Sequence, residues 1–309
     1  MKKSLLADLS LLLVAFVWGT TFVIVQNAIS TLPPHAFNAI RFLLASGLLF
    51  LFILLFYREQ LRAFSKKMIG SGIVLGIWLF GGYAFQTVGL LYTTSSKAGF
   101  ITGLSIVLVP LFSLMLLKQR PKWPAIIGVL VATIGLYLLT LSDSLNMNNG
   151  DFLVFLCAIC FAMQIIFTGK YAPSYPALPL ALIQIFTVSV LSAGASFLFE
   201  NGQTYLNKDI LTQNHVLWAL LITAGPATAL AFLTQTICQR FTTPTRVALI
   251  FAMEPVFAAL AAFIWTDEVL GFKALSGCLL IFIGMILSEL QPEQLLNNMK
   301  KKKTVPQNH

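Results

Sequence analysis

The chain has 309 residues, of which 58% are hydrophobic and only 10% charged. A soluble domain carries roughly 25% charged residues, so this composition excludes a soluble fold and makes lipid the solvent. The net charge of +9 lies in short basic segments between apolar runs and in a Lys300–Lys303 tail; without a soluble basic domain, it excludes a nucleic-acid partner.

Ten apolar runs follow one another, each about the twenty residues that a helix needs to cross the hydrocarbon core. Turn-forming residues separate them, as at Pro33, Pro121 and Gly150. We therefore predict an all-α integral membrane protein with ten transmembrane helices. In chain order their ranges are 9–29, 36–57, 68–91, 95–117, 123–141, 151–170, 178–199, 215–238, 245–265 and 271–290.

Lysine and arginine gather in alternate loops, which predicts the orientation of the helices. The basic side holds Lys2, Lys3, Arg58, Arg62, Lys66, Lys67, Lys118, Arg120, Lys122, Lys170, Arg240 and Lys300–Lys303. The opposite loops hold only Lys208 and Lys273, beside acidic residues such as Asp143, Asp267 and Glu268. This bias predicts a multi-pass protein of the cytoplasmic membrane with both termini in the cytoplasm.

The chain carries an internal repeat. Residues 92–97 align with 241–246, so that Lys97 meets Arg246, and without a gap Gly128 meets Gly277 and Gly135 meets Gly284. Each half has five spans, an odd number, so the second half must enter the membrane in the opposite direction. Two inverted five-helix repeats are typical of secondary transporters. We expect the first repeat at 1–147, the second at 148–292 and a basic cytoplasmic tail at 293–309.

Lys97 and Arg246 stand near the starts of the fourth and ninth helices, where a cation opposes the helix dipole. The same unfavourable choice in both halves predicts that each cation has a compensating anion. Two roles remain open for them: their side chains extend to the membrane interface, or they line the pathway and meet a substrate carboxylate or an acid of the protein.

Glu254 lies near the middle of the ninth helix, next to Pro255. A carboxylate at that depth is paired, protonated or exposed to an aqueous cavity, so it is either a proton-coupling acid or a structural one. Arg41, early in the second helix, is expected to be structural. An aspartate stands at the start of both the first helix (Asp8) and the sixth helix (Asp151), at corresponding positions of the two halves.

Five uncharged side chains are further candidates for a binding pocket: Trp18, Tyr83, Gln86, Gln164 and Gln235. The alternative for each is an interhelical hydrogen bond or packing. Pairs of glycines, such as Gly72 with Gly76 and Gly99 with Gly103, predict close helix approach. The four cysteines lie in apolar segments and are expected to be packing residues. We predict no catalytic residue, cofactor or metal site.

The residues Trp18-Gly19-Thr20-Thr21-Phe22, Arg41-Phe42 and Glu254-Pro255-Val256 resemble the EamA-type members of the drug/metabolite transporter superfamily over roughly residues 8–290. This resemblance implies a ten-helix inverted-repeat fold and a central cavity lined by helices 1, 3, 4, 6, 8 and 9. It also implies traffic in small metabolites, commonly amino-acid export. One departure is Lys118-Gln119-Arg120, which replaces the acidic residue usual after the fourth helix.

We therefore predict a secondary active transporter, not an enzyme, that exports amino acids or related small metabolites by alternating access as a monomer or homodimer. Its predicted substrate-binding residues are Trp18, Tyr83, Gln86, Lys97, Gln164, Gln235, Arg246 and Glu254, with Lys97 or Arg246 meeting an anionic substrate group. An importer of sugars or nucleosides and a xenobiotic efflux carrier are the alternatives. A channel-like conduit and an intramembrane enzyme are more remote ones.

Overall fold

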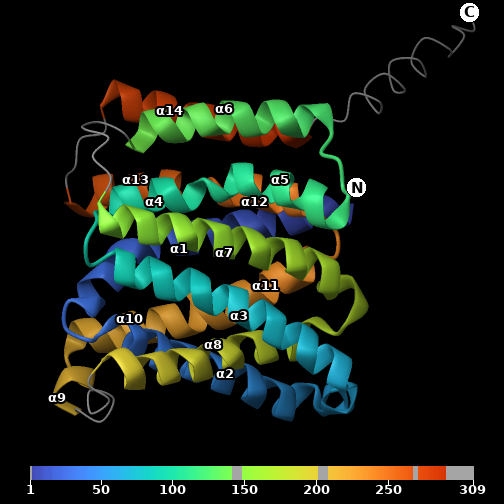
Figure 1. Cartoon of the computed structure of the whole chain (residues 1–309), viewed down its shortest axis with the longest axis vertical. Coiled ribbons are helices and arrows are strands. Elements are labelled where there is room, and N and C mark those ends of the chain that lie inside the picture. The colour runs from blue at the N-terminus through green and yellow to red at the C-terminus, as the bar shows by residue number, and fades with distance from the viewer. Residues whose placement is uncertain (1, 141–147, 201–207, 267–270, 290–309) are drawn as a thin grey trace, which may run out of the picture.

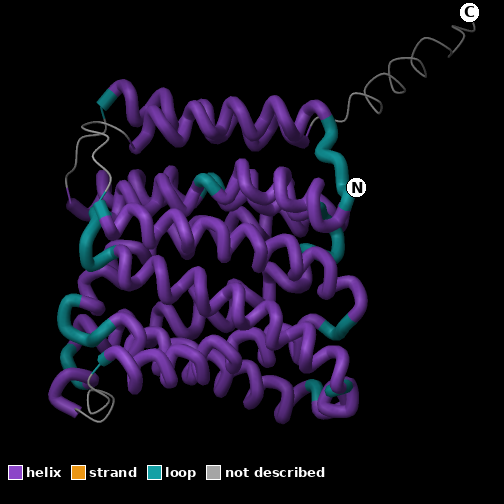
Figure 2. The backbone as a smooth tube through the Cα atoms, viewed as in Figure 1, coloured by secondary structure: helices purple, strands orange, loops and turns teal. Residues whose placement is uncertain are grey.

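The computed structural model describes residues 2–140, 148–200, 208–266 and 271–289, and they form a bundle of parallel and antiparallel helices (Figures 1 and 2). Among these residues, eight helical segments are long and apolar enough to cross a membrane, and 123–139 and 272–288 form two shorter apolar helices. The prediction of an all-α, multi-pass membrane protein is confirmed. The tail at 293–309, the boundary near 147 and the acidic residues Asp143, Asp267 and Glu268 lie outside the described residues.

The helices follow the predicted order. The first half contains α1 (Lys2–Ile29), α2 (Pro34–Phe56), η1 (Arg58–Ala63), α3 (Lys66–Gly89), α4 (Ser95–Gly103), α5 (Ser105–Leu117) and α6 (Trp123–Thr140). The second contains α7 (Asn149–Tyr171), η2 (Ala172–Ser174), α8 (Ala177–Phe199), α9 (Lys208–Leu211), α10 (Asn214–Ala224), the π-helical turn η4 (Gly225–Leu230), α11 (Ala231–Cys238), α12 (Pro244–Phe251), α13 (Glu254–Thr266) and α14 (Phe272–Glu289).

The bundle has two ends. We call the end where α1 begins the N-terminal end; η1, η2 and the turns before α6 and α12 also lie there (Figure 1). The opposite end carries the turn after α1, the turn before α4 and the short helix α9. Because α1 begins at the N-terminal end and its counterpart α7 at the opposite end, the two repeats run in opposite directions, as predicted.

Helices of the two repeats pack against each other in matching pairs. Helix α2 packs on α8, and α6 on α14. Helix α3 packs on α7, while the equivalent contact of the other repeat joins α1 to α11. The apolar clusters between them include side chains such as Leu11, Phe42 and Phe232, which are almost fully buried. The inverted repeats therefore share one core instead of forming two separate bundles.

Two membrane helices that the sequence predicts as continuous are broken near their middle. The regular helical hydrogen bonding is interrupted at Leu104, between α4 and α5, and around Met253, between α12 and α13. These residues are equivalent in the register that aligns Lys97 with Arg246, and each amide bonds three residues back, at 3.1 and 3.0 Å. Pro255 explains the second break, because it has no N–H to continue the helical hydrogen bonds.

Glycines bring α6 and α14 into backbone contact, as the repeat predicts. A Cβ atom at Gly135 would lie 2.6 Å from the carbonyl oxygen of Gly277, and one at Gly284 would lie 2.6 Å from that of Gly128. Such distances leave no room for a side chain, so glycine at these positions permits the helices to touch.

The other predicted glycine pairs differ in their role. Cβ atoms at Gly72 and Gly76 would overlap α8, which confirms a close approach of α3 to α8. A Cβ at Gly103 would lie 2.8 Å from Leu136, but one at Gly99 would meet nothing within 4 Å. The prediction for Gly99 is therefore wrong, because this residue faces a cavity instead of another helix.

Candidate functional site

A cavity lies in the middle of the bundle. Its walls come from α1, α3, α4, α5, α7, α11, α12 and α13. These segments belong to membrane helices 1, 3, 4, 6, 8 and 9, the ones that the family resemblance implies. One further residue, Arg41, comes from α2. Six of the twenty lining residues are aromatic: Trp18, Phe22, Tyr83, Phe161, Phe232 and Phe251.

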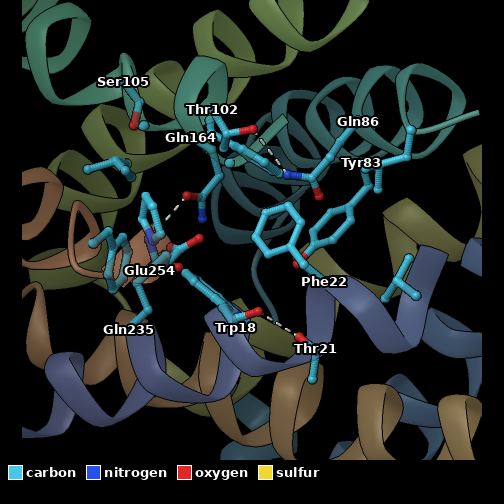
Figure 3. A pocket seen from close by; sticks show the side chains of 18 of the residues that line it. Trp18, Thr21, Phe22, Tyr83, Gln86, Thr102, Ser105, Gln164, Gln235 and Glu254 are labelled. Atoms are coloured by element: carbon cyan, nitrogen blue, oxygen red, sulfur yellow. Dashed lines mark hydrogen bonds between the residues drawn. The ribbon is translucent and has the colours of Figure 1, made fainter. Parts of the chain in front are cut away.

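Six of the eight predicted binding residues line this cavity together: Trp18, Tyr83, Gln86, Gln164, Gln235 and Glu254 (Figure 3). Residues more than 200 positions apart in the sequence thus meet at one place, as the indole N–H of Trp18 shows by donating to the carbonyl of Ala227 at 2.7 Å. Lys97 and Arg246 are not among the lining residues. The structure places these two cations at the ends of the bundle.

The cavity lies between the repeats, and its walls repeat as well. In the register that aligns Lys97 with Arg246, Gln86 meets Gln235 and Ser105 meets Glu254, and all four line the cavity. In the register that aligns Asp8 with Asp151, two more lining pairs match: Trp18 with Phe161, and Thr21 with Gln164. A site built from equivalent residues of both halves lies where transporters with inverted repeats bind their substrates.

Glu254 breaks this symmetry chemically. It opens α13 at the helix break, where its equivalent in the first repeat is only Ser105. Its carboxylate points into the cavity beside Gln164 and Trp18 (Figure 3). Among the described residues, the structure gives this carboxylate no hydrogen bond and no ion pair. Because it faces the cavity without such a partner, this group can take up a proton or interact with a ligand.

Arg41 is the cation of the same cavity, and sequence reasoning assigned it only a structural role. Its Nε donates to the hydroxyl of Thr228 at 2.7 Å, and its guanidinium carbon lies 4.8 Å from the centre of the Tyr83 ring. These contacts hold the side chain, while the Nη1 nitrogen makes no hydrogen bond to a described residue. A charge in an apolar helix was the available signal, but only the fold shows that it reaches the cavity.

Glutamine side chains form a hydrogen-bonded network on the side of the cavity toward the N-terminal end. The amide of Gln235 donates to the side-chain oxygens of Gln164, at 3.1 Å, and Gln239, at 3.2 Å. Gln239 donates onward to the carbonyl of Ile165 at 3.0 Å, and Gln164 donates to Thr168 at 3.1 Å. We call Gln164, Gln235 and Gln239 the glutamine network. All three are buried.

Lys97 and Arg246 each pair with an aspartate of the other repeat. Lys97 Nζ lies 3.7 Å from Asp151 Oδ2, and Arg246 Nη2 bonds directly to Asp8 Oδ2. The expectation that each cation has a compensating anion is confirmed. Of the two roles left open, the structure shows a pairing with an acid of the protein.

Two inverted repeats of membrane helices, with broken helices and a cavity between the repeats, are typical of membrane transporters. The sequence matches the EamA-like transporter family twice, over residues 5–141 and 148–290. The chain therefore belongs to the EamA-like transporter family, within the drug/metabolite transporter superfamily.

Its relatives agree with this class. A protein named "Uncharacterized transporter" from Archaeoglobus fulgidus is 35% identical over 94% of this chain and 87% of its own length. The "Uncharacterized transporter YoaV" of Bacillus subtilis is 20% identical over 91% of this chain and 95% of its own. A solved structure titled "Crystal structure of protein" has the same fold, with a TM-score of 0.76 at 20% identity over 94% of this chain and 98% of its own.

Proposed function

We propose that this transporter is a secondary active carrier of amino acids or closely related zwitterionic amines, working by alternating access in the cytoplasmic membrane with export as its direction. The observation that carries the substrate class is the carboxylate of Glu254, which faces the cavity without a partner among the described residues. The direction rests on the family resemblance, and the cytoplasmic position of both termini on the basic loops.

The cavity offers a separate partner for each part of an amino acid. Glu254 would receive the ammonium group, and the Nη1 donors of Arg41, with the hydroxyl of Ser105, would receive the carboxylate. The aromatic walls would contact an apolar side chain and also attract the cation through their ring faces. These charge-assisted bonds would be stronger than in bulk water, because the cavity lies inside the helical bundle.

The glutamines support a second candidate. Amide groups beside aromatic rings also suit the hydroxyls and rings of sugars or nucleosides, and Gln86, Gln164 and Gln235 all line the cavity. Such substrates carry no ammonium group and would leave Glu254 without its partner. The free carboxylate therefore favours the amine, and the comparison between the two classes belongs in the same experiment.

Counterflow in proteoliposomes tests the substrate class. Vesicles preloaded with an unlabelled amino acid should accumulate the labelled one in a saturable way, whereas protein-free liposomes should not. N-acetylation removes the ammonium charge, so we expect the N-acetyl derivative to compete for the site with an affinity at least about tenfold lower. Equal competition by the N-acetyl derivative, or counterflow with sugars alone, would contradict the proposal. Repeating the assay with a pH gradient shows whether transport is coupled to protons.

A further inference from the structure

The two ion pairs occupy equivalent places at the two ends of the bundle. Asp8 on α1 pairs with Arg246 on α12 near the N-terminal end, and Asp151 on α7 pairs with Lys97 on α4 near the opposite end. Both aspartates are equivalent in the repeat, and so are both cations. Each pair joins one repeat to the other, so it reports whether the repeats touch at that end.

The sequence builds both pairs in the same way. The hydroxyl of Thr94 accepts the amide of Lys97 as the N-cap of α4, and Thr243 does the same for Arg246 in α12. Both cations therefore stand in the first turn of a helix, where the dipole repels them. The side chains are only partly exposed, at 29% for Lys97 and 20% for Arg246. In each repeat an aspartate thus offsets the unfavourable placement of a cation.

The two pairs differ in their present state. Asp151 accepts a 2.5 Å hydrogen bond from the hydroxyl of Thr93 and a 3.0 Å bond from the amide of Asn148, while Lys97 stays 3.7 Å away, beyond hydrogen-bond distance. At the other end, the guanidinium of Arg246 binds Asp8 directly.

The N-terminal end also lacks the counterpart of the threonine bond. Thr242 is the equivalent of Thr93, but its hydroxyl is buried without a hydrogen bond to a described residue, and so is Asp8 Oδ1. One end therefore has a tight ion pair and no threonine bond. The other end has a threonine bond and a loose ion pair. The equivalent aspartates, cations and threonines of the two repeats therefore make different contacts at the two ends of the bundle.

The two sides of the cavity, toward the two ends of the bundle, also differ from each other. The hydrogen-bonded glutamine network lies on its N-terminal side, and the Asp8–Arg246 pair lies nearer still to that end. Toward the opposite end its lining continues through Val25, Leu90 and Gly99. The tight pair is thus found at the end where the glutamine network lies, and the loose pair at the end toward which the cavity lining continues.

We propose that the pairs are alternating latches: Asp8–Arg246 holds the N-terminal end shut and separates when that end opens, while Asp151–Lys97 tightens as the opposite end closes. This inference rests on the proposed alternating-access function. Because each latch stabilises a different state, loss of one shifts the population toward the state that the other latch stabilises. The glutamine network opens together with the Asp8–Arg246 latch.

Accessibility of a cavity cysteine tests the latches without any substrate. The four native cysteines are replaced, and Ser105→Cys serves as the reporter for a charged, membrane-impermeant thiol reagent applied to sealed vesicles of either orientation. We expect Asp8→Asn to raise the labelling rate from the face at the N-terminal end about fivefold or more, and to lower it from the other face. Asp151→Asn should do the reverse. Exchanging the charges, with Asp8→Arg and Arg246→Asp together, should restore the original ratio.

Mirror-image shifts are the signature of latches, because a merely structural ion pair would change labelling from both faces alike. Shifts in the same direction for Asp8→Asn and Asp151→Asn, or an unchanged ratio in folded protein, would overturn the proposal. Size-exclusion chromatography identifies variants that have not folded, and the charge exchange then provides the test. If the labelling shifts as expected but amino-acid counterflow is absent, only the substrate assignment is contradicted. If counterflow is present but the ratio of labelling from the two faces does not change in the variants, only the latches are contradicted.

Discussion

Replacing Glu254 with glutamine should weaken the binding of a zwitterionic substrate about thirtyfold or more. Glutamine keeps the shape of the side chain, so the cavity and the helix break before α13 should stay intact. What disappears is the carboxylate that faces the cavity without a partner among the described residues. Truncating one partner of a close, desolvated charge pair costs about 2 kcal/mol or more, which corresponds to that factor. Binding to purified protein in detergent measures it directly.

Ser105 supplies the matched control, because it holds the equivalent position at the other helix break. Ser105→Ala removes one neutral hydrogen-bonding group, so its effect should be only a few-fold. Equal losses in Glu254→Gln and Ser105→Ala would refute a charge-specific role for Glu254. An unchanged unfolding temperature of Glu254→Gln would show that the lost binding does not come from lost structure.

The same variant also separates two roles of the acid in transport. If Glu254 carries the coupling proton, Glu254→Gln should make counterflow insensitive to a pH gradient. If it binds the substrate alone, the remaining counterflow should still respond to the gradient. The measurement compares the ratio of transport with and without the gradient in wild type and variant, so that a low absolute rate does not affect the conclusion.

The fold was predictable because membrane spans leave a strong signal. Runs of about twenty apolar residues and the alternation of basic loops define the number and direction of helices. The match of Lys97 with Arg246 and the odd number of spans in each half defined the inversion. The breaks at Leu104 and Met253 gave a weaker signal, since hydropathy continues through both and only Pro255 marks one of them.

The site was predictable only in part, because hydropathy reports depth in the membrane and not the direction of a side chain. Glu254 and the glutamines could be nominated, since polar groups in an apolar helix must face protein or a cavity. The same reasoning could not separate Arg41, which lines the cavity, from Lys97, which does not. That difference depends on how each helix is rotated and on where its partner lies, here Asp151.

A second large effect is expected at the glycine contact between α6 and α14. Gly135→Leu should lower the unfolding temperature clearly, because even a Cβ there would lie 2.6 Å from the carbonyl of Gly277 and the helices would have to separate. Overpacking of this kind costs about 1–3 kcal/mol. Gly47→Leu is the matched control: this glycine also lies inside a helix, α2, but a Cβ there would meet nothing within 4 Å.

The consequence for function should be different from that of Glu254→Gln. Neither α6 nor α14 contributes a residue to the cavity wall, so Gly135→Leu protein that remains folded should bind substrate with nearly the wild-type affinity. Thermal unfolding and binding, measured on the same preparation in detergent, separate the two properties. A Gly135→Leu variant that keeps its stability would show that the helices can move apart freely. One that stays folded but loses affinity would show that the contact between α6 and α14 shapes the cavity from a distance.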